Sequence, residues 1–270
     1  MIEKQIFFGN LSKMKTEFQD PVQYKLKLGE EVLDLNSNVG GNLKLQFTGQ
    51  INCINCGRKT NKSFAQGFCF PCFRDAPQNA ECIIRPELCR AHLGEGRDPE
   101  WEERNHNQPH VVYLAINSGI KVGVTRATQV PFRWMDQGAW KAVKLAETPN
   151  RYEAGRLEVE LKQYASDKTA WQRMLKNELA SEVEVLETKN KLQELVKDEF
   201  NRYDSSEDEI YTFHYPVIEY PQKVKSHNLD KEPLLEGKLM GIKGQYWILE
   251  GGKVINIRKY GGYQVELELN

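Results

Sequence analysis

Four cysteines form two C-x2-C pairs, Cys53 with Cys56 and Cys69 with Cys72, and twelve residues separate the pairs. Each pair can place its two sulfurs on one side of a tight backbone knuckle. Two such knuckles can close a tetrahedron of thiolates around one zinc ion. The spacing therefore predicts a closed, structural zinc site. The alternative, four unrelated buried cysteines, accounts less well for the pairing.

The two remaining cysteines, Cys82 and Cys89, precede His92 in a C-x6-C-x2-H pattern. These three side chains are soft metal ligands, and they predict a second zinc site for which the pattern supplies no fourth ligand. His106 or His110 could complete it. The alternative is that both thiols are simply buried as small apolar groups, which is the usual place of isolated cysteines.

The compartment follows from the same cysteines, since all six lie between Cys53 and Cys89. Such a cluster is more readily explained by metal in a reducing compartment than by disulfides. The first residues lack the long apolar stretch of a signal peptide, and nowhere do about 18 apolar residues run together. We therefore expect a soluble, cytoplasmic protein with no membrane partner.

Charge limits the partners that the chain can attract. Its 37 basic residues nearly cancel its 38 acidic ones, which excludes a global field that would draw the protein to nucleic acid. Residues 121–176 hold 11 Lys or Arg against 6 Asp or Glu, a net of +5, whereas residues 177–210 hold 4 against 11, a net of −7. The first segment is the one suited to a polyanion, unless both are solvated helix faces.

Hydrophobic periodicity and turn residues predict an α+β protein in five parts. These are an N-terminal β segment (1–50), a zinc-binding module (51–105), an α/β domain (106–176), an acidic helical connector (177–210) and a C-terminal β module (211–270). In the third part, two β runs flank Asn117-Ser118-Gly119, which is typical of a hairpin, and helices are expected over 152–164 and about 169–200. Regularly spaced glycines predict a small curved sheet or partial barrel at the C-terminus.

Several short motifs together resemble a bacterial family of unassigned function, over nearly the whole chain. They are Cys53-x2-Cys56, Gln66-Gly67-x-Cys69-x-Pro71-Cys72-Phe73, Pro86-Glu87-Leu88-Cys89, Lys121-Val122-Gly123-Val124-Thr125-Arg126, Arg133-Trp134-x-Asp136-Gln137-Gly138-Ala139 and Asp167-Lys168-Thr169. Within this family, residues from about 110 to 165 resemble a divergent GIY-YIG endonuclease domain. That resemblance implies a small mixed sheet with helices and phosphodiester cleavage assisted by Mg²⁺ or Mn²⁺.

The resemblance implies four catalytic positions. Tyr113 corresponds to the tyrosine of the first motif, and Lys121 stands where the second motif has its tyrosine. Arg133 corresponds to the helix arginine and Glu158 to the carboxylate that holds the metal. An arginine and a divalent ion are the expected stabilisers of a phosphodiester transition state, because it gathers negative charge.

The departures from the GIY-YIG pattern keep structural alternatives open. Lys121 is one departure, and valines replace the Gly and Ile of the first motif. Tyr113 could be a half-buried strand residue, Arg133 could lie over the neighbouring tryptophan ring, and Glu158 could pair with the lysine one helical turn on.

The predicted function is nucleic-acid binding, to DNA or RNA, by a zinc protein, with metal-dependent endonuclease activity left open. Nearby basic and aromatic side chains could contact phosphate and stack on bases; they are Arg126, Trp134, Trp140 and Lys141. Two alternatives remain. One is a non-catalytic nucleic-acid or ribonucleoprotein adaptor, and the other is a protein-interaction scaffold, which the near-zero net charge favours.

Overall fold

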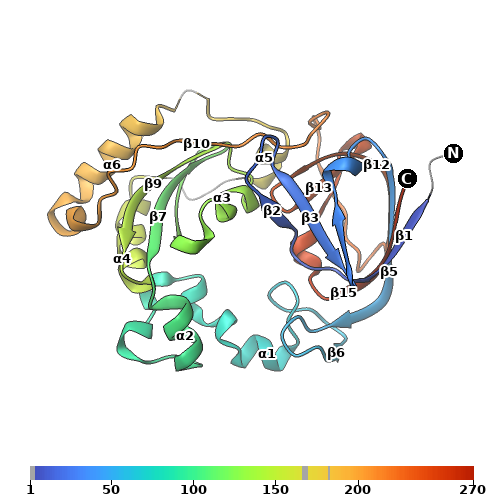
Figure 1. Cartoon of the computed structure of the whole chain (residues 1–270), viewed down its shortest axis with the longest axis horizontal. Helices are drawn as coiled ribbons and strands as arrows, with labels where there is room; N and C mark the ends of the chain where they lie inside the picture. Colours follow the sequence, from blue (N-terminus) through green and yellow to red (C-terminus); the bar gives the residue numbers. More distant parts are fainter. Residues whose placement is uncertain (1–3, 166–169, 182) are drawn as a thin grey trace. The chain divides into compact units, whose positions relative to one another are not determined.

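The structure is a computed structural model that describes residues 4–165, 170–181 and 183–270. The motif Asp167-Lys168-Thr169 therefore lies outside the described residues. The chain is a mixed α+β protein with several sheets and few helices, drawn in Figure 1 with many of its elements labelled. It divides into two compact units. Unit 1 comprises residues 1–74, 135–138 and 214–270, and unit 2 comprises 75–134 and 139–213.

Unit 1 is built on an eight-stranded sheet with the order β1-β15-β5-β12-β13-β14-β11, in which β6 pairs with β5. All pairs are antiparallel except β11 with β14. The strands are β1 (Gln5–Asn10), β5 (Asn42–Asn52), β6 (Lys59–Thr60), β11 (Lys225–Ser226), β12 (Leu234–Lys243), β13 (Tyr246–Leu249), β14 (Lys253–Asn256) and β15 (Tyr263–Leu269). A smaller sheet contains β2 (Lys15–Glu17), β3 (Gln23–Leu28) and β4 (Glu31–Asp34).

The N-terminal and C-terminal β segments, predicted as separate parts, share this larger sheet. Leu45 of β5 lies opposite Leu235 of β12 on one side and Leu267 of β15 on the other. All three side chains are buried. Each strand alternates apolar with polar residues and so has one apolar face, which it buries by joining strands that are distant in sequence.

Unit 2 contains a four-stranded antiparallel sheet with the order β10-β9-β7-β8. Its strands are β7 (His110–Ile116), β8 (Ile120–Arg126), β9 (Lys141–Thr148) and β10 (Tyr211–Thr212). The helices are α2 (Pro99–His106), α3 (Phe132–Asp136, whose last two residues belong to unit 1), α4 (Arg151–Lys162), α5 (Trp171–Leu175) and α6 (Val185–Phe200), and α1 (Phe70–Asp75) lies at the boundary. The predicted hairpin is confirmed as β7 and β8. The helix expected over about 169–200 is interrupted after α5, where Asn177 has a φ of 57°.

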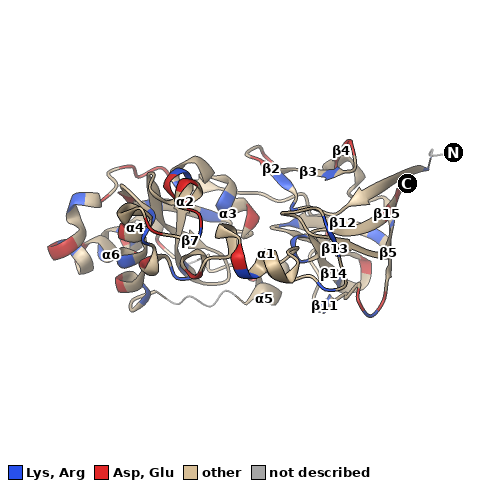
Figure 2. Cartoon of the chain, turned by 90° about the horizontal axis from the view of Figure 1, so that it is seen from below, with Lys and Arg blue, Asp and Glu red and all other residues tan. Residues whose placement is uncertain are grey.

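Helices α4 and α6 cover one face of this sheet. Alternate residues of β7, including Val112 and Leu114, are buried there against Leu157 of α4 and Leu192 of α6. Helix α6 is therefore part of the core of unit 2, which differs from the predicted acidic connector. Figure 2 shows basic and acidic positions interleaved along α6. In the described part of the chain, no helix is long and apolar enough to cross a membrane.

Candidate functional site

Unit 1 brings Cys53, Cys56, Cys69 and Cys72 together. Their sulfur atoms all lie within 4.8 Å of one another, and 3.8 Å separates Cys56 Sγ from Cys69 Sγ. Sulfurs about 2.3 Å from a tetrahedral zinc ion would be about 3.8 Å apart. The cluster could therefore bind a metal such as zinc.

The backbone around Cys53 is arranged to stabilise its thiolate. Cys53 follows the last residue of β5, and its carbonyl accepts the Gly57 N–H at 2.8 Å, which closes a knuckle. Burial acts to raise the pKa of Cys53, but hydrogen bonds from the backbone of Cys69, Cys56 and Asn55 outweigh it and lower the pKa to about 6. The side chain of Asn55 donates to Cys72 Sγ at 3.4 Å, which acts to lower the pKa of Cys72, but burial and hydrogen bonds with the other three thiols raise that pKa to about 12. N–H donors favour the charged form that a metal requires.

A second cluster lies in unit 2 and consists of Cys82, Cys89, Glu102 and His106. One ligand atom from each residue lies within 4.8 Å of the others, and all four side chains are buried. Glu102 and His106 are one turn apart on α2 and therefore share a face. His106 Nδ1 is 3.8 Å from Cys82 Sγ and 3.3 Å from Glu102 Oε2. A hydrogen bond from Cys82 lowers the pKa of Cys89 to about 4, although burial opposes this shift.

The histidines differ from the predicted pattern. His92, predicted as the third ligand, is exposed and stacks on Tyr152 with ring centroids 4.5 Å apart. His110 donates from Nδ1 to the Gln108 carbonyl at 2.7 Å, and burial lowers its pKa to about 4. The fourth member, Glu102, was missed. The signal that could have found it is the i, i+4 spacing of Glu102 and His106 on a predicted helix.

Two of the four predicted catalytic residues, Arg133 and Glu158, act electrostatically on Arg151, the first residue of α4. Burial is the main cause that lowers the pKa of Arg151, and the positive charge of Arg133 lowers it further, whereas Glu158 raises it. Arg151 is thus within electrostatic range of both residues. Glu158 is buried, and its Oε2 is 3.3 Å from Nζ of Lys162.

Tyr113 and Lys121 lie on the other face of the sheet from the one that α4 covers. Tyr113 is opposite Gly123 in the β7–β8 register, and a Cβ at position 123 would come within 2.6 Å of the Tyr113 hydroxyl. The Tyr113 ring is 1% exposed and meets Trp134 edge to face at 5.7 Å. Lys121 is two residues from Gly123 on β8 and so shares its face. The pair therefore lies on the opposite face of the sheet from α4, which carries Glu158, whereas Trp134, the neighbour of Arg133 on α3, contacts Tyr113.

Residues 40–265 match the model of a family described as "Protein of unknown function (DUF2797)". The chain belongs to the DUF2797 family. The matched range contains both ligand clusters as well as Arg133 and Glu158. No curated protein and no solved structure matches the chain. The predicted resemblance to a family of unassigned function is confirmed.

In this DUF2797 chain, the side chains predicted to contact nucleic acid are mostly packed or paired within unit 2. Trp134 is 0% exposed and therefore presents no ring face on which a base could stack. Lys141 Nζ lies 4.3 Å from the centre of the Trp140 ring, which packs partly against the core. Arg126 donates from Nη1 to Asn105 Oδ1 at 2.6 Å. Of the four predicted contacts, Trp134 is therefore unavailable for base stacking, and Arg126 is already bonded to a neighbouring side chain.

Proposed function

We propose that this protein binds nucleic acid through unit 2, while zinc at the four cysteines of unit 1 supports the fold. The observation that carries the proposal is the electrostatic influence of Arg133 on Arg151, whose pKa the positive charge of Arg133 helps to lower. Two like charges in a partly buried place repel each other, so a phosphate that lies between them would be stabilised. Glu158 compensates part of this charge. Phosphate contacts of this kind supply most of the affinity of sequence-independent binding.

The order of the elements supports a GIY-YIG-like core for unit 2. The hairpin β7–β8 comes first, α3 with Arg133 follows, and β9 leads into α4 with Glu158. All six thiols are free and gathered into ligand clusters, which supports a reducing, cytoplasmic location. The thiolate donors around Cys53 support zinc as the metal of unit 1, because soft sulfur ligands favour it.

The surroundings of Glu158 fit a divalent cation poorly. Its Oε2 lies 3.3 Å from Nζ of Lys162, and Arg151 is within electrostatic range, so two cations already act on it. Among the described residues, Glu158 also belongs to no group of three or more metal-ligand side chains. The non-catalytic form of the proposal is therefore favoured. The burial of Tyr113 also favours the non-catalytic form, because a catalytic tyrosine must contact the water molecule that it activates.

A binding titration tests the proposal. Fluorescence anisotropy with labelled single-stranded and duplex DNA and RNA, repeated over a series of NaCl concentrations, is expected to show affinity that falls with salt. Arg133→Ala should weaken binding and lower the salt slope by about one, because one phosphate contact is lost. Arg173→Ala is the matched control. It removes an arginine from the same basic segment that is exposed and paired with Glu178, and it should bind as wild type does.

Cleavage is measured in the same samples with Mg²⁺ or Mn²⁺ present. No cleavage by the wild-type protein, together with weaker binding by Arg133→Ala, is the expected result. If the wild-type protein cleaves, Glu158→Ala should abolish that activity and leave binding largely intact. No binding to any of these nucleic acids at low salt would instead favour the protein-interaction scaffold. Equal binding by Arg133→Ala and wild type would remove Arg133 from the site.

A further inference from the structure

Residues 77–93 form an unusual segment of unit 2. The segment contains four short 3-10 turns and no longer element: η2 (Pro77–Asn79), η3 (Glu81–Ile83), η4 (Pro86–Leu88) and η5 (Ala91–Leu93). Its buried cluster consists of Ala80, Cys82, Cys89 and Ala91, with Tyr152 packed beside them. The four large aliphatic side chains of the segment are exposed instead; they are Ile83, Ile84, Leu88 and Leu93.

This arrangement is the reverse of what apolar burial would produce. Burial of a Leu or Ile side chain stabilises a fold by about 1.5–3 kcal/mol, and this segment forgoes that contribution while it buries two thiols. A loop with so small a core requires another source of stability, and in small domains that source is commonly a disulfide or a metal. The two cysteines are free thiols rather than a disulfide, and their burial together with a histidine and a carboxylate suits a metal.

We infer that Cys82, Cys89, His106 and Glu102 hold a second Zn²⁺, bound by two sulfurs, Nδ1 and Oε2. The interatomic distances of 3.8 Å from Cys82 Sγ to His106 Nδ1 and 3.3 Å from His106 Nδ1 to Glu102 Oε2 suit the edges of a tetrahedron. The four side chains are between 2% and 6% exposed. A carboxylate this deeply buried is costly unless it is paired or bound to a metal.

Glu102 is oriented as a ligand by the residues around it. Its Oε1 accepts the Arg97 backbone N–H at 2.9 Å, which turns Oε2 toward His106. Position 96 must be glycine for this approach, because a Cβ there would lie 2.4 Å from Glu102 Cδ. Outer contacts of this type fix the direction of a metal ligand. With four protein ligands the site is closed and therefore structural.

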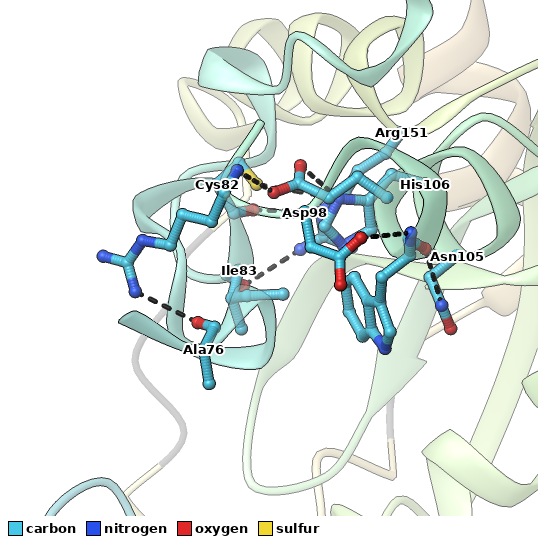
Figure 3. A network of polar contacts seen from close by, with 10 residues as sticks. Ala76, Cys82, Ile83, Asp98, Asn105, His106 and Arg151 are labelled. Carbon is cyan, nitrogen blue, oxygen red and sulfur yellow. Dashed lines mark hydrogen bonds and ion pairs between the residues drawn. The ribbon is translucent and has the colours of Figure 1, made fainter. Parts of the chain in front are cut away.

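The second centre is joined to α4 through Arg151. The guanidinium donates from Nε to the Cys82 carbonyl and from Nη2 to the Ile83 carbonyl, both at 2.9 Å. Figure 3 shows Arg151 beside Cys82 and His106. The centre therefore fixes the loop against the helix that carries Glu158. This positional role rests on the proposed function, whereas the presence of the metal does not.

Zinc content of the full chain tests the inference. After expression with ample zinc and removal of loose metal by gel filtration, mass spectrometry of the wild-type protein is expected to find two zinc ions per chain. Cys89→Ser should retain one. Glu102→Gln should lose the second ion to a competing chelator far sooner than wild type does, because an amide is a poor zinc ligand. His92→Ala and Glu103→Gln are matched controls outside the cluster and should keep both ions.

One zinc per wild-type chain, or two in Cys89→Ser, would overturn the inference. If the variants do not fold, X-ray absorption of the wild-type protein decides. Two centres require nitrogen or oxygen ligands beside sulfur, whereas the unit 1 cluster alone would show sulfur only. Two zinc ions in a protein that binds no nucleic acid would refute the proposed function and leave the second centre standing.

Discussion

Cys69→Ser is expected to remove one zinc ion per chain and to unfold the segment around residues 53–72. Several large apolar side chains of this segment are exposed rather than packed in a core. Cys53, Phe68 and Cys69 are buried, whereas Ile54 and Phe70 are exposed. Zinc binding contributes about 10–16 kcal/mol in isolated zinc-finger peptides, and even a fraction of that exceeds the effect of an ordinary substitution, about 0.5–3 kcal/mol.

Calorimetry and zinc content together measure this effect. The unfolding midpoint of the transition that involves unit 1 should fall by more than about 10 °C, since 1 kcal/mol corresponds to about 2–4 °C in a protein of this size. Arg58→Ser is the control, because it changes an exposed side chain in the same segment. A Cys69→Ser protein with unchanged zinc content and midpoint would show that the four thiols are not a metal site.

Local patterns predicted the parts of the structure that depend on near neighbours. Asn117-Ser118-Gly119 sets the turn of the hairpin by its own chemistry, and β7 and β8 flank it as expected. The four cysteines of unit 1 were found for the same reason, because the two knuckles are short and each holds its own pair. In such cases residues that are close in sequence are also the ones in contact, so the spacing predicts the contact directly.

Pairing between distant segments was outside the reach of those patterns. Leu45 and Leu267 are 222 positions apart in the numbering and lie opposite each other, and neither strand indicates its partner by its own alternation. Glu102 illustrates the same limit at the second cluster. Glu102 belongs to the cluster only because the chain folds so that α2 lies against Cys82 and Cys89. His92 is nearer to Cys89 in sequence, but its ring stacks on Tyr152 instead.

Trp134 shows why residue type alone misplaced a binding residue. A tryptophan beside an arginine in a basic segment suits base stacking as well as it suits a core. The structure buries the ring among Tyr113, Tyr211 and Phe213. Tyr211 and Phe213 are among the last residues of unit 2 in the sequence, so the residues around position 134 do not indicate that they pack there.

Gly155→Ala is expected to destabilise unit 2, although helix propensity alone predicts that it would stabilise the helix. Position 155 is in the interior of α4, where alanine is favoured over glycine by about 1 kcal/mol. A Cβ at this position would, however, lie 2.2 Å from the Glu87 backbone nitrogen and 2.3 Å from the Pro86 carbonyl carbon. Because these are backbone atoms, the loop must move away from α4, at a cost of about 1–3 kcal/mol or more.

The displaced loop carries Cys89 two residues beyond Glu87, so Gly155→Ala should also release zinc from the second centre sooner than wild type does. The unit 1 cluster should keep its ion. Chemical denaturation and zinc release to a chelator measure the two effects. Gly119→Ala is the control, since no atom lies within 4 Å of its added Cβ, and it should change neither. A Gly155→Ala protein that is more stable than wild type would mean that helix propensity prevails, and that the loop does not pack on α4 as closely as the distances require.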